Sequence, residues 1–169
     1  RVEYGALVLF TSREQMRQAV DALPTAMRSV VLVQNALPRT QLLRRHRERV
    51  ENGEPSIIFG MQSFGEGLDL PGRLCESVFI TKLPFAPPDD PVGEARAEWL
   101  RAVGRDPFSE LVVPATAIRL AQWAGRAIRT EEDQAHVYCY DKRLTRTSYG
   151  QRLLKGLPPF TLERRALGQ

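Results

Sequence analysis

The sequence contains little cysteine and no long apolar run. Its 169 residues include two cysteines, Cys75 and Cys139, and neither belongs to a C-x-x-C pair. This spacing argues against a zinc or iron–sulfur site within the chain, and we expect two buried thiols in a reducing cytosol. No apolar run approaches the length needed to cross a bilayer. We therefore expect a cytoplasmic chain with no membrane partner.

A phosphate-binding loop is also missing. The pattern G-x-x-x-x-G-K-[ST] occurs nowhere in the chain. A nucleotide bound here would lack its main phosphate cradle and its magnesium ligands. We therefore expect the isolated chain not to hydrolyse ATP. The chain begins at Arg1 and enters an apolar run almost at once, which leads us to expect a fragment of a longer protein.

The overall composition is that of one globular domain. Apolar residues make up 43% and charged residues 26% of the chain, and the formal net charge is +4. A mild positive charge permits an anionic partner, such as nucleic acid or a nucleotide, but does not require one.

Short apolar segments alternate with longer amphipathic segments. The apolar segments are rich in Val, Ile, Phe and Tyr, which predicts strands that are buried on both faces of a parallel sheet. These strands are expected at 6–10, 30–34, 56–60, 77–81 and 136–140. Helices are expected at about 12–23, 39–52, 91–103, 114–129 and from 148 onward. The alternation predicts an α/β domain in which ligands bind beyond the carboxyl ends of the strands.

Several helix ends are predicted from capping residues. Ser12 with Gln15, and Ser148 with Gln151, each have the spacing of a capping box. Gly53 follows the arginine-rich helix that is expected at 39–52, and we expect it to end that helix. Within that helix, His46 falls on the apolar stripe, which favours packing over ligand binding as its role.

The segment "QWAGRAIRT" is the strongest chemical signal in the chain. If the helix continues to Arg129, then Gln122, Arg126 and Arg129 fall at i, i+4 and i+7 on one face. Gly125 leaves room beside Arg126 for a phosphate, and arginine's forked donors suit phosphate oxygens. The alternative is that both arginines pair with nearby acids or with the helix C-terminus. The apolar face of the same helix is predicted to bury Ile118, Ala121 and Ile128.

The segment "MQSFGEGLDLPG" follows the third predicted strand. Gly65 and Gly67 allow close backbone approach or positive φ, while Glu66 and Asp69 can accept hydrogen bonds from a sugar or pair with cations. The alternative interpretation is a tight turn with solvated acids.

Polar residues follow several strands and are candidates for nucleic-acid contact. They are Thr11, Ser12, Gln34, Gln62 and Ser63. Hydroxyls and amides at a helix start can hold a phosphate, although Ser12 can also serve only as a cap. For the arginine-rich helix a solvated face is favoured because Glu48 and Glu51 alternate with its arginines. Phe85 and Trp99 are capable of stacking on bases, but packing or docking on another domain is the safer interpretation.

Five segments together carry a resemblance to a known family. "QWAGRAIR" matches the Q-x-x-G-R-x-x-R motif of superfamily two helicases, and "SFGEGLDLPG" matches the loop that precedes it. The other three segments are "FTSREQM", "KLPFAPPDDP" and "YDKRLTRTSYGQRLLKGLPPF". In this order they resemble the second motor domain of the DinG branch of the XPD-like DNA helicases, from about Gly5 to Phe160.

The resemblance implies a fold and a set of roles. It implies a RecA-like parallel sheet flanked by helices over residues 1–160, with a tail of unknown role at 161–169. Arg129 is implied as the arginine finger, with Arg126 and Gln122 beside it. Glu66, Gly67 and Asp69 are implied to border the nucleotide and to couple it to DNA.

The resemblance also implies partners for this domain. They are ATP with Mg, shared with a first motor domain of the parent chain, and single-stranded DNA moved 5′ to 3′. An iron–sulfur cluster is expected only in that first domain. Two alternatives remain open: a non-catalytic nucleic-acid-binding or docking module with the same fold, and an RNA-directed helicase of the same superfamily.

Overall fold

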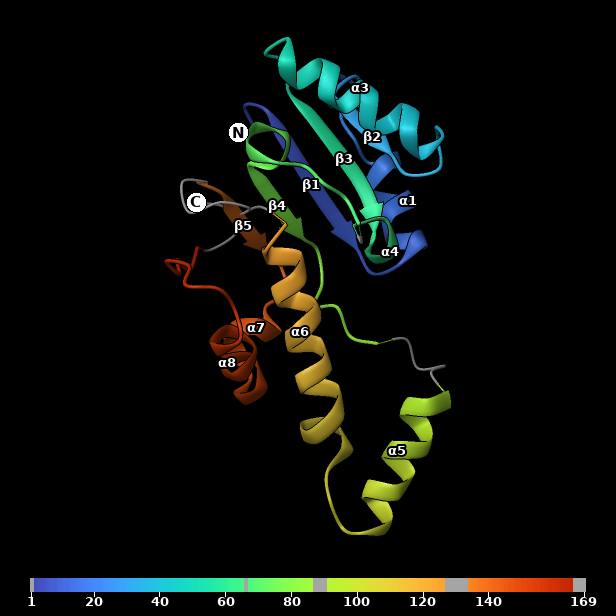
Figure 1. The fold of residues 1–169 in the computed structure, drawn as a ribbon, viewed down its shortest axis with the longest axis vertical. Helices are drawn as coiled ribbons and strands as arrows, with labels where there is room; N and C mark the ends of the chain where they lie inside the picture. Colours follow the sequence, from blue (N-terminus) through green and yellow to red (C-terminus); the bar gives the residue numbers. More distant parts are fainter. Residues whose placement is uncertain (1, 66, 87–90, 127–133, 166–169) are drawn as a thin grey trace.

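The fold is a five-stranded parallel sheet with helices on both faces (Figure 1). The computed structural model describes residues 2–65, 67–86, 91–126 and 134–165. The strand order is β2-β3-β1-β4-β5, and every pairing is parallel. The strands are β1 Gly5–Phe10, β2 Val31–Val33, β3 Ser56–Met61, β4 Ser77–Ile80 and β5 His136–Cys139. The predicted α/β class and the positions of all five predicted strands are confirmed. The prediction of burial on both faces is wrong for β5, which lies at the edge of the sheet and has His136 and Tyr138 exposed.

The helices separate into two layers. The described helices are α1 Arg13–Asp21, α2 Thr25–Arg28, α3 Arg39–Glu51, α4 Gln62–Gly65, α5 Pro91–Ala102, α6 Val113–Ala124, α7 Arg143–Arg146 and α8 Ser148–Lys155. A 3-10 turn covers Gly72–Cys75 and a π-helical turn covers Phe108–Val112. Helix α1 packs on one face of the sheet, while α3, α6 and α8 contribute to the core on the other face.

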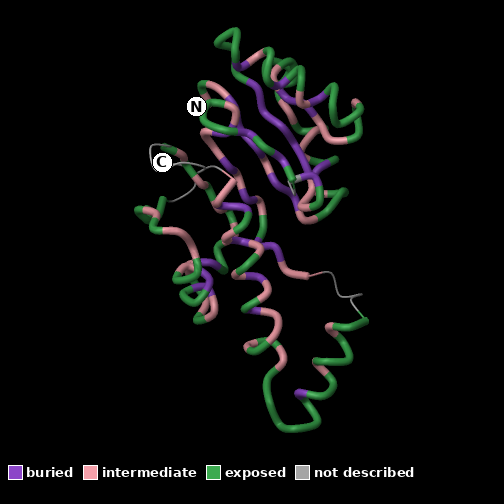
Figure 2. Tube along the Cα trace, in the orientation of Figure 1, coloured by how far each residue is buried: buried purple, intermediate pink, exposed green. Residues whose placement is uncertain are grey.

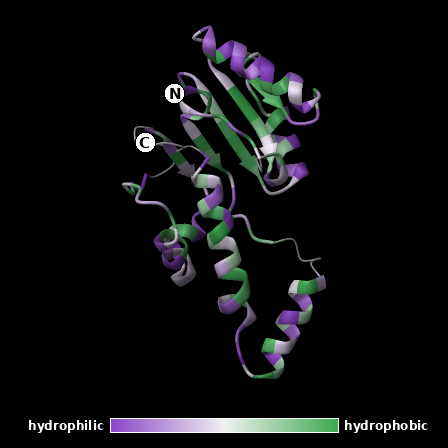
Figure 3. Cartoon of the chain, viewed as in Figure 1, coloured by the Kyte–Doolittle hydropathy of each residue, from purple (hydrophilic) through white to green (hydrophobic). Residues whose placement is uncertain are grey.

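The central strand β1 shows how the sheet builds two cores. Leu7 and Leu9 point into the larger core, and Ala6 and Phe10 point into the core under α1. This alternation follows from the two-residue period of a strand. Buried residues therefore concentrate in the strands (Figure 2), and the strands are also the most hydrophobic part of the fold (Figure 3).

Three helix ends were predicted from capping residues, and two of them agree with the structure. Ser12 caps α1 by accepting a hydrogen bond from the Gln15 amide at 3.3 Å. Gly53 has φ +76° just after α3, as a helix-ending glycine does. The prediction of Ser148 as the last cap was wrong by one residue. Thr147 is the cap, and its hydroxyl accepts from the Gly150 amide at 3.0 Å.

Helix α6 ends earlier than the sequence predicted. It ends at Ala124, with Gly125 as its C-cap, so Arg126 lies outside the helix. Glycine is a poor helix former, and its entropy cost favours ending the helix there. The prediction that one helical face carries Gln122 and Arg126 is therefore wrong, and Arg129 lies outside the described residues.

The apolar face of α6 also differs from its prediction. Ile118 is 61% exposed rather than buried. The buried face of the helix is formed by Val113, Thr116, Leu120 and Trp123. Ile118 lies two residues from both Thr116 and Leu120, so it is rotated by about 200° from each of these buried residues and lies on the opposite side of the helix.

Helix α5 lies farthest from the sheet (Figure 1). Pro91 is its first residue, as predicted, and Leu100 is its buried side chain. Trp99 is 59% exposed, so it does not pack in the core of this domain, and docking on another domain stays a prediction. Among the described residues, no helix combines the length and the apolar character needed to span a membrane.

His46 fastens α3 to the sheet through two buried hydrogen bonds. The ring is fully buried, with Nδ1 2.8 Å from Ser56 Oγ and Nε2 2.8 Å from the Leu74 carbonyl oxygen. A carbonyl only accepts, so Nε2 carries the proton and Nδ1 accepts from the serine hydroxyl. The prediction that His46 is a packed residue is confirmed.

This environment gives stability a dependence on pH. Burial lowers the pKa of His46 below its ordinary value of 6.5, against the opposing effect of the Leu74 carbonyl. The unfolded chain therefore takes up the proton first as pH falls, and stability that is fully present above pH 6.5 is lost below it. His46→Gln should remove this loss and cost about 1–3 kcal/mol at neutral pH through broken buried hydrogen bonds. Urea unfolding between pH 5 and 8 measures both effects.

The matched control is His136→Gln, because His136 is exposed on β5 and does not touch this network. This variant should have nearly the same free energy of unfolding at neutral pH as the wild-type chain, and the same change of that free energy with pH. If the stability of His46→Gln changed with pH as that of the wild type does, His46 would not be the source of the pH dependence.

Candidate nucleotide and nucleic-acid interface

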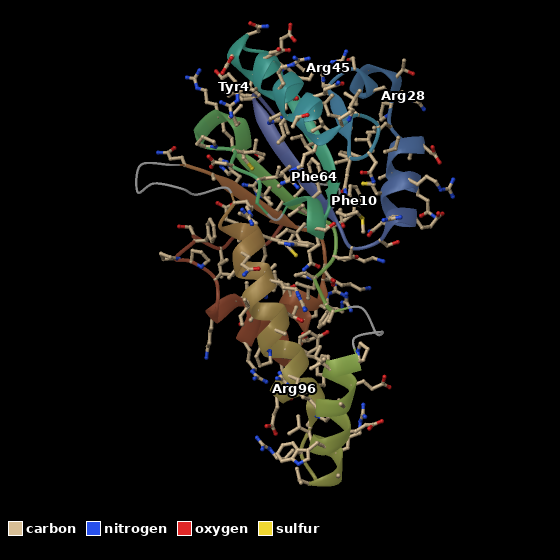
Figure 4. All side chains as sticks on the ribbon, turned by 45° about the vertical axis from the view of Figure 1, so that its right-hand side comes forward. Tyr4, Phe10, Arg28, Arg45, Phe64 and Arg96 are labelled. Carbon is tan, nitrogen blue, oxygen red and sulfur yellow. The ribbon has the colours of Figure 1, made fainter. Side chains whose placement is uncertain are left out.

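The carboxyl ends of the strands meet at one edge of the sheet and bring several predicted site residues together. Thr11 follows β1, Gln34 follows β2, and Gln62 follows β3. Because the strands are parallel and paired in the order β2-β3-β1, these three residues lie at the same edge of the sheet. In Figure 4, Phe10 at the end of β1 and Phe64 beyond the end of β3 lie in this region.

Side chains fasten neighbouring strands to one another at this edge. The Gln34 side-chain oxygen accepts from the Met61 amide at 2.7 Å, which joins the ends of β2 and β3. The Thr81 hydroxyl donates to the Leu9 carbonyl at 2.9 Å, which joins β4 to β1. Asp141 Oδ2 accepts from the Leu83 amide at 3.0 Å, which joins the segments after β5 and β4. These side-chain hydrogen bonds thus connect the strand ends beyond the last backbone hydrogen bonds of the sheet.

Two of the predicted DNA-contacting residues therefore have structural roles as well. The oxygen of Gln34 is engaged within the fold, and the Ser12 hydroxyl oxygen accepts the capping bond of α1. A hydroxyl that accepts one hydrogen bond still has its own hydrogen to donate, so capping and phosphate contact are compatible. Contact with DNA stays a prediction for Thr11, Ser12, Gln34, Gln62 and Ser63.

The glycine-rich segment forms a one-turn helix and a sharp bend. Helix α4 begins directly after β3, and Phe64 within it is buried at 5% exposure. Gly60 makes room for this ring, because a Cβ there would stand 2.8 Å from Phe64. Gly67 has φ +71°, a conformation that glycine adopts without strain. Asp69 is exposed, and Glu66 lies outside the described residues.

Arg126 connects the two segments that carry the strongest sequence motifs. Its Nη1 donates to the Leu68 carbonyl oxygen at 3.2 Å, across 58 residues of sequence. The guanidinium therefore reaches from the turn that follows α6 to the glycine-rich segment. Gln122 is exposed on the last turn of α6, and Arg129 lies outside the described residues.

Three residues of this region escaped the sequence analysis. Thr81 and Asp141 each come just after a strand, which is the signal that marked the other candidates. Arg39 begins α3 and places its guanidinium 5.1 Å from the centre of the Phe64 ring. Nothing in the local sequence indicates that contact, because it joins residues 25 positions apart.

The carboxyl group of Asp141, which lies in this region, has a pKa well below its ordinary value. Burial of the carboxylate alone would raise its pKa. Hydrogen bonds from the Arg143 side chain and from the Leu83 and Arg143 amides outweigh burial and lower the pKa from 3.8 to about 2. The aspartate is thus a fixed anion that organises the loops after β4 and β5.

The described residues do not form a metal site. Among residues 2–65, 67–86, 91–126 and 134–165, no group of three His, Cys, Asp or Glu side chains is placed to hold an ion. Cys75 is buried and Cys139 is half-buried, and neither forms a disulfide with another described residue. Burial raises the pKa of Cys139, as expected for a packed thiol rather than a metal ligand.

Comparison with known proteins gives concordant matches. A family described as the helicase C-terminal domain matches residues 1–160. The chain is 44% identical over 161 residues to the ATP-dependent DNA helicase DinG of Photobacterium profundum, covering 94% of this chain and 23% of that protein. It is 45% identical over 159 residues to DinG of Escherichia coli strain K12, covering 94% of this chain and 22% of that protein. The chain thus spans about a quarter of the length of these relatives.

Solved structures agree on the fold. An apo structure of XPD superimposes with a TM-score of 0.68 at 23% identity, covering 91% of this chain and 31% of that one. A second XPD helicase structure gives a TM-score of 0.67 at 22% identity, covering 92% of this chain and 28% of that one. At this level of identity the match shows the RecA-like fold alone, which confirms the expected fold class.

Asp141→Asn tests how much the Asp141 carboxylate stabilises the fold through its hydrogen bonds to Leu83 and Arg143. The amide keeps one acceptor but loses the charge that holds Arg143, so we expect a loss of about 1–3 kcal/mol at neutral pH. Since the folded pKa is about 2 and the ordinary value 3.8, the wild-type advantage is present above pH 3.8 and disappears as pH falls towards 2. Urea unfolding at pH 7 and pH 3 measures it.

Asp21→Asn is the control, since that exposed carboxylate pairs with Arg17 at 3.4 Å on the surface of α1. It should cost under about 1 kcal/mol. Equal costs in the two variants would show that Asp141 is an ordinary surface charge.

Proposed function

This chain belongs to the helicase C-terminal domain family and is of the DinG type, and we propose that it is the second motor half of an ATP-dependent 5′ to 3′ DNA helicase. The single observation that supports this best is the hydrogen bond from Arg126 to the Leu68 carbonyl. It joins the Q-x-x-G-R-x-x-R segment to the glycine-rich segment, which is the physical link required if nucleotide and DNA are to be coupled through this domain.

In this proposal the arginine-containing segment faces ATP. Arg129 is the arginine finger, and Arg126 and Gln122 lie beside it. Phosphoryl transfer is helped mainly by positioning and by neutralising charge in the transition state, which a guanidinium provides. Glu66, Gly67 and Asp69 border the nucleotide. The first motor domain of the parent chain supplies the phosphate cradle and the magnesium ligands, so hydrolysis depends on closure of the two domains.

The other loops at the same edge face single-stranded DNA. Thr11, Ser12, Gln34, Gln62 and Ser63 contact phosphate and sugar rather than bases, which gives binding without sequence preference. Opening and closing of the two domains moves the strand across this edge. An iron–sulfur cluster, if the parent carries one, belongs to the first motor domain.

The proposal extends to the setting of the parent protein. Its relatives are DNA helicases of bacteria by name, and we place this protein in the cytoplasm, where bacterial DNA lies. The alternative is a non-catalytic nucleic-acid-binding or docking module that keeps the fold. Turnover by the parent protein separates the two.

The isolated chain should not hydrolyse ATP at a useful rate, because it lacks a phosphate-binding loop. Phosphate release with saturating single-stranded DNA measures this. Robust turnover by a preparation free of contaminating ATPase would contradict the proposal that the first motor domain supplies the phosphate-binding loop and the magnesium ligands.

Arg129→Lys in the parent helicase should reduce DNA-stimulated ATP turnover by at least about 100-fold, because arginine fingers contribute on the order of 10³–10⁵ to the rate of such transfers. Lysine keeps the charge but loses the planar fork that engages two phosphate oxygens. Melting temperature and DNA affinity should stay close to wild type. The measurement is steady-state turnover at saturating DNA.

Arg45→Lys is the control for charge-conserving replacement, because Arg45 is exposed on α3 (Figure 4). It should leave turnover unchanged. Near-normal turnover in Arg129→Lys would remove Arg129 from the catalytic role and leave Arg126 as the candidate, because lysine can replace arginine only where the charge alone is needed.

A further inference from the structure

Arg39 reaches the glycine-rich segment from a helix that none of the motifs includes. Its guanidinium lies over the Phe64 ring, 5.1 Å from the ring centre. A Cβ built on Gly67 would stand 3.8 Å from Arg39 Nη2. The same side chain therefore lies against both α4 and the bend that follows it.

The position of Arg39 in α3 is not explained by the needs of that helix. Arg39 is its first residue, and the N-cap Pro38 makes no side-chain capping bond. A cation at a helix N-terminus opposes the helix dipole. Arg39 is exposed, whereas the ring that it covers is buried. The contact thus serves the glycine-rich segment rather than α3.

Arg126 holds the same segment from another element. It donates to the Leu68 carbonyl from the turn after α6, while Arg39 covers Phe64 from the start of α3. Gly60 gives the Phe64 ring its space, and Gly67 gives the bend its positive φ. Two guanidinium groups therefore hold a segment whose glycines would otherwise leave it many conformations.

We propose that Arg39 is a positioning residue, which holds helix α4 and the bend at Gly67 in the orientation that couples DNA contact to ATP turnover. It acts through Phe64 and the bend at Gly67. This inference rests on the proposed function, because it assigns a role within that reaction. It predicts that loss of Arg39 weakens the response of turnover to DNA more than it weakens the fold.

The test uses the full-length parent helicase with Arg39→Gln and Arg39→Lys. In Arg39→Gln the ratio of ATP turnover with single-stranded DNA to turnover without it should fall by about two- to fivefold, as expected for loss of one cation–π contact from an exposed arginine. Arg39→Lys keeps a cation over the ring and should recover part of the ratio. Arg45→Gln, on the exposed surface of the same helix, is the matched control and should keep the wild-type ratio.

Amide hydrogen exchange provides a second measurement that does not depend on activity. Peptides that cover residues 62–70 should exchange about two- to fivefold faster in Arg39→Gln than in wild type, because local opening becomes easier. The Arg45→Gln control should exchange like wild type, and melting temperatures should agree across the variants. If Arg39→Gln does not fold, the same two measurements on Arg39→Lys decide.

The outcomes separate the inference from the proposed function. If wild type shows no DNA-stimulated turnover, the proposed function is wrong and the positioning role falls with it. If wild type is stimulated and Arg39→Gln is stimulated equally, the positioning role is overturned while the proposed function stands, whether or not exchange is faster. Reduced stimulation with faster exchange confined to 62–70 supports the inference.

Discussion

Parallel pairing of five strands is the constraint on which the rest of this structure depends. A parallel sheet needs helical crossovers, and these cover both of its faces. The central strands β1 and β3 are accordingly rich in buried apolar residues, and the candidate DNA-contacting residues lie just beyond the strand ends. Gln34, Thr81 and Asp141 then fasten the carboxyl ends of neighbouring strands through hydrogen bonds to backbone groups. That edge is a rigid base from which loops can contact a ligand.

The same edge explains how distant segments come to act together. The glycine-rich segment leaves β3 near the centre of the sheet, and the arginine-containing segment follows α6, which packs on the larger core. Arg126 joins them through the Leu68 carbonyl, and Arg39 approaches from α3. A movement at either segment must therefore be accommodated by the other. Such mechanical linkage is what a domain needs if it is to relate a nucleotide to a nucleic-acid strand.

The predictions succeeded where local signals are strong and failed where the fold overrides them. The five strands, the Ser12 cap and the packed His46 follow from periodicity and capping chemistry. The continuation of α6 to Arg129 failed because the apolar pattern was followed past Gly125, whose poor helix propensity favours a helix end there. The exposure of Ile118 has another cause, since an apolar pattern alone cannot indicate which face of a helix meets the core. Thr147 and Ser148 are both good caps, and only the backbone conformation selects the first.

By itself the sequence determined the α/β class, the strand positions and the two motif segments, because alternation, capping and glycine placement act over a few residues. It also supplied the resemblance to a helicase motor domain. Only the tertiary structure decided the strand order, the bonds across the carboxyl edge and the contacts of Arg126 and Arg39 with the glycine-rich segment. Those contacts join residues between 25 and 72 positions apart, and no local rule of chain geometry specifies which distant side chain will reach a given carbonyl or ring.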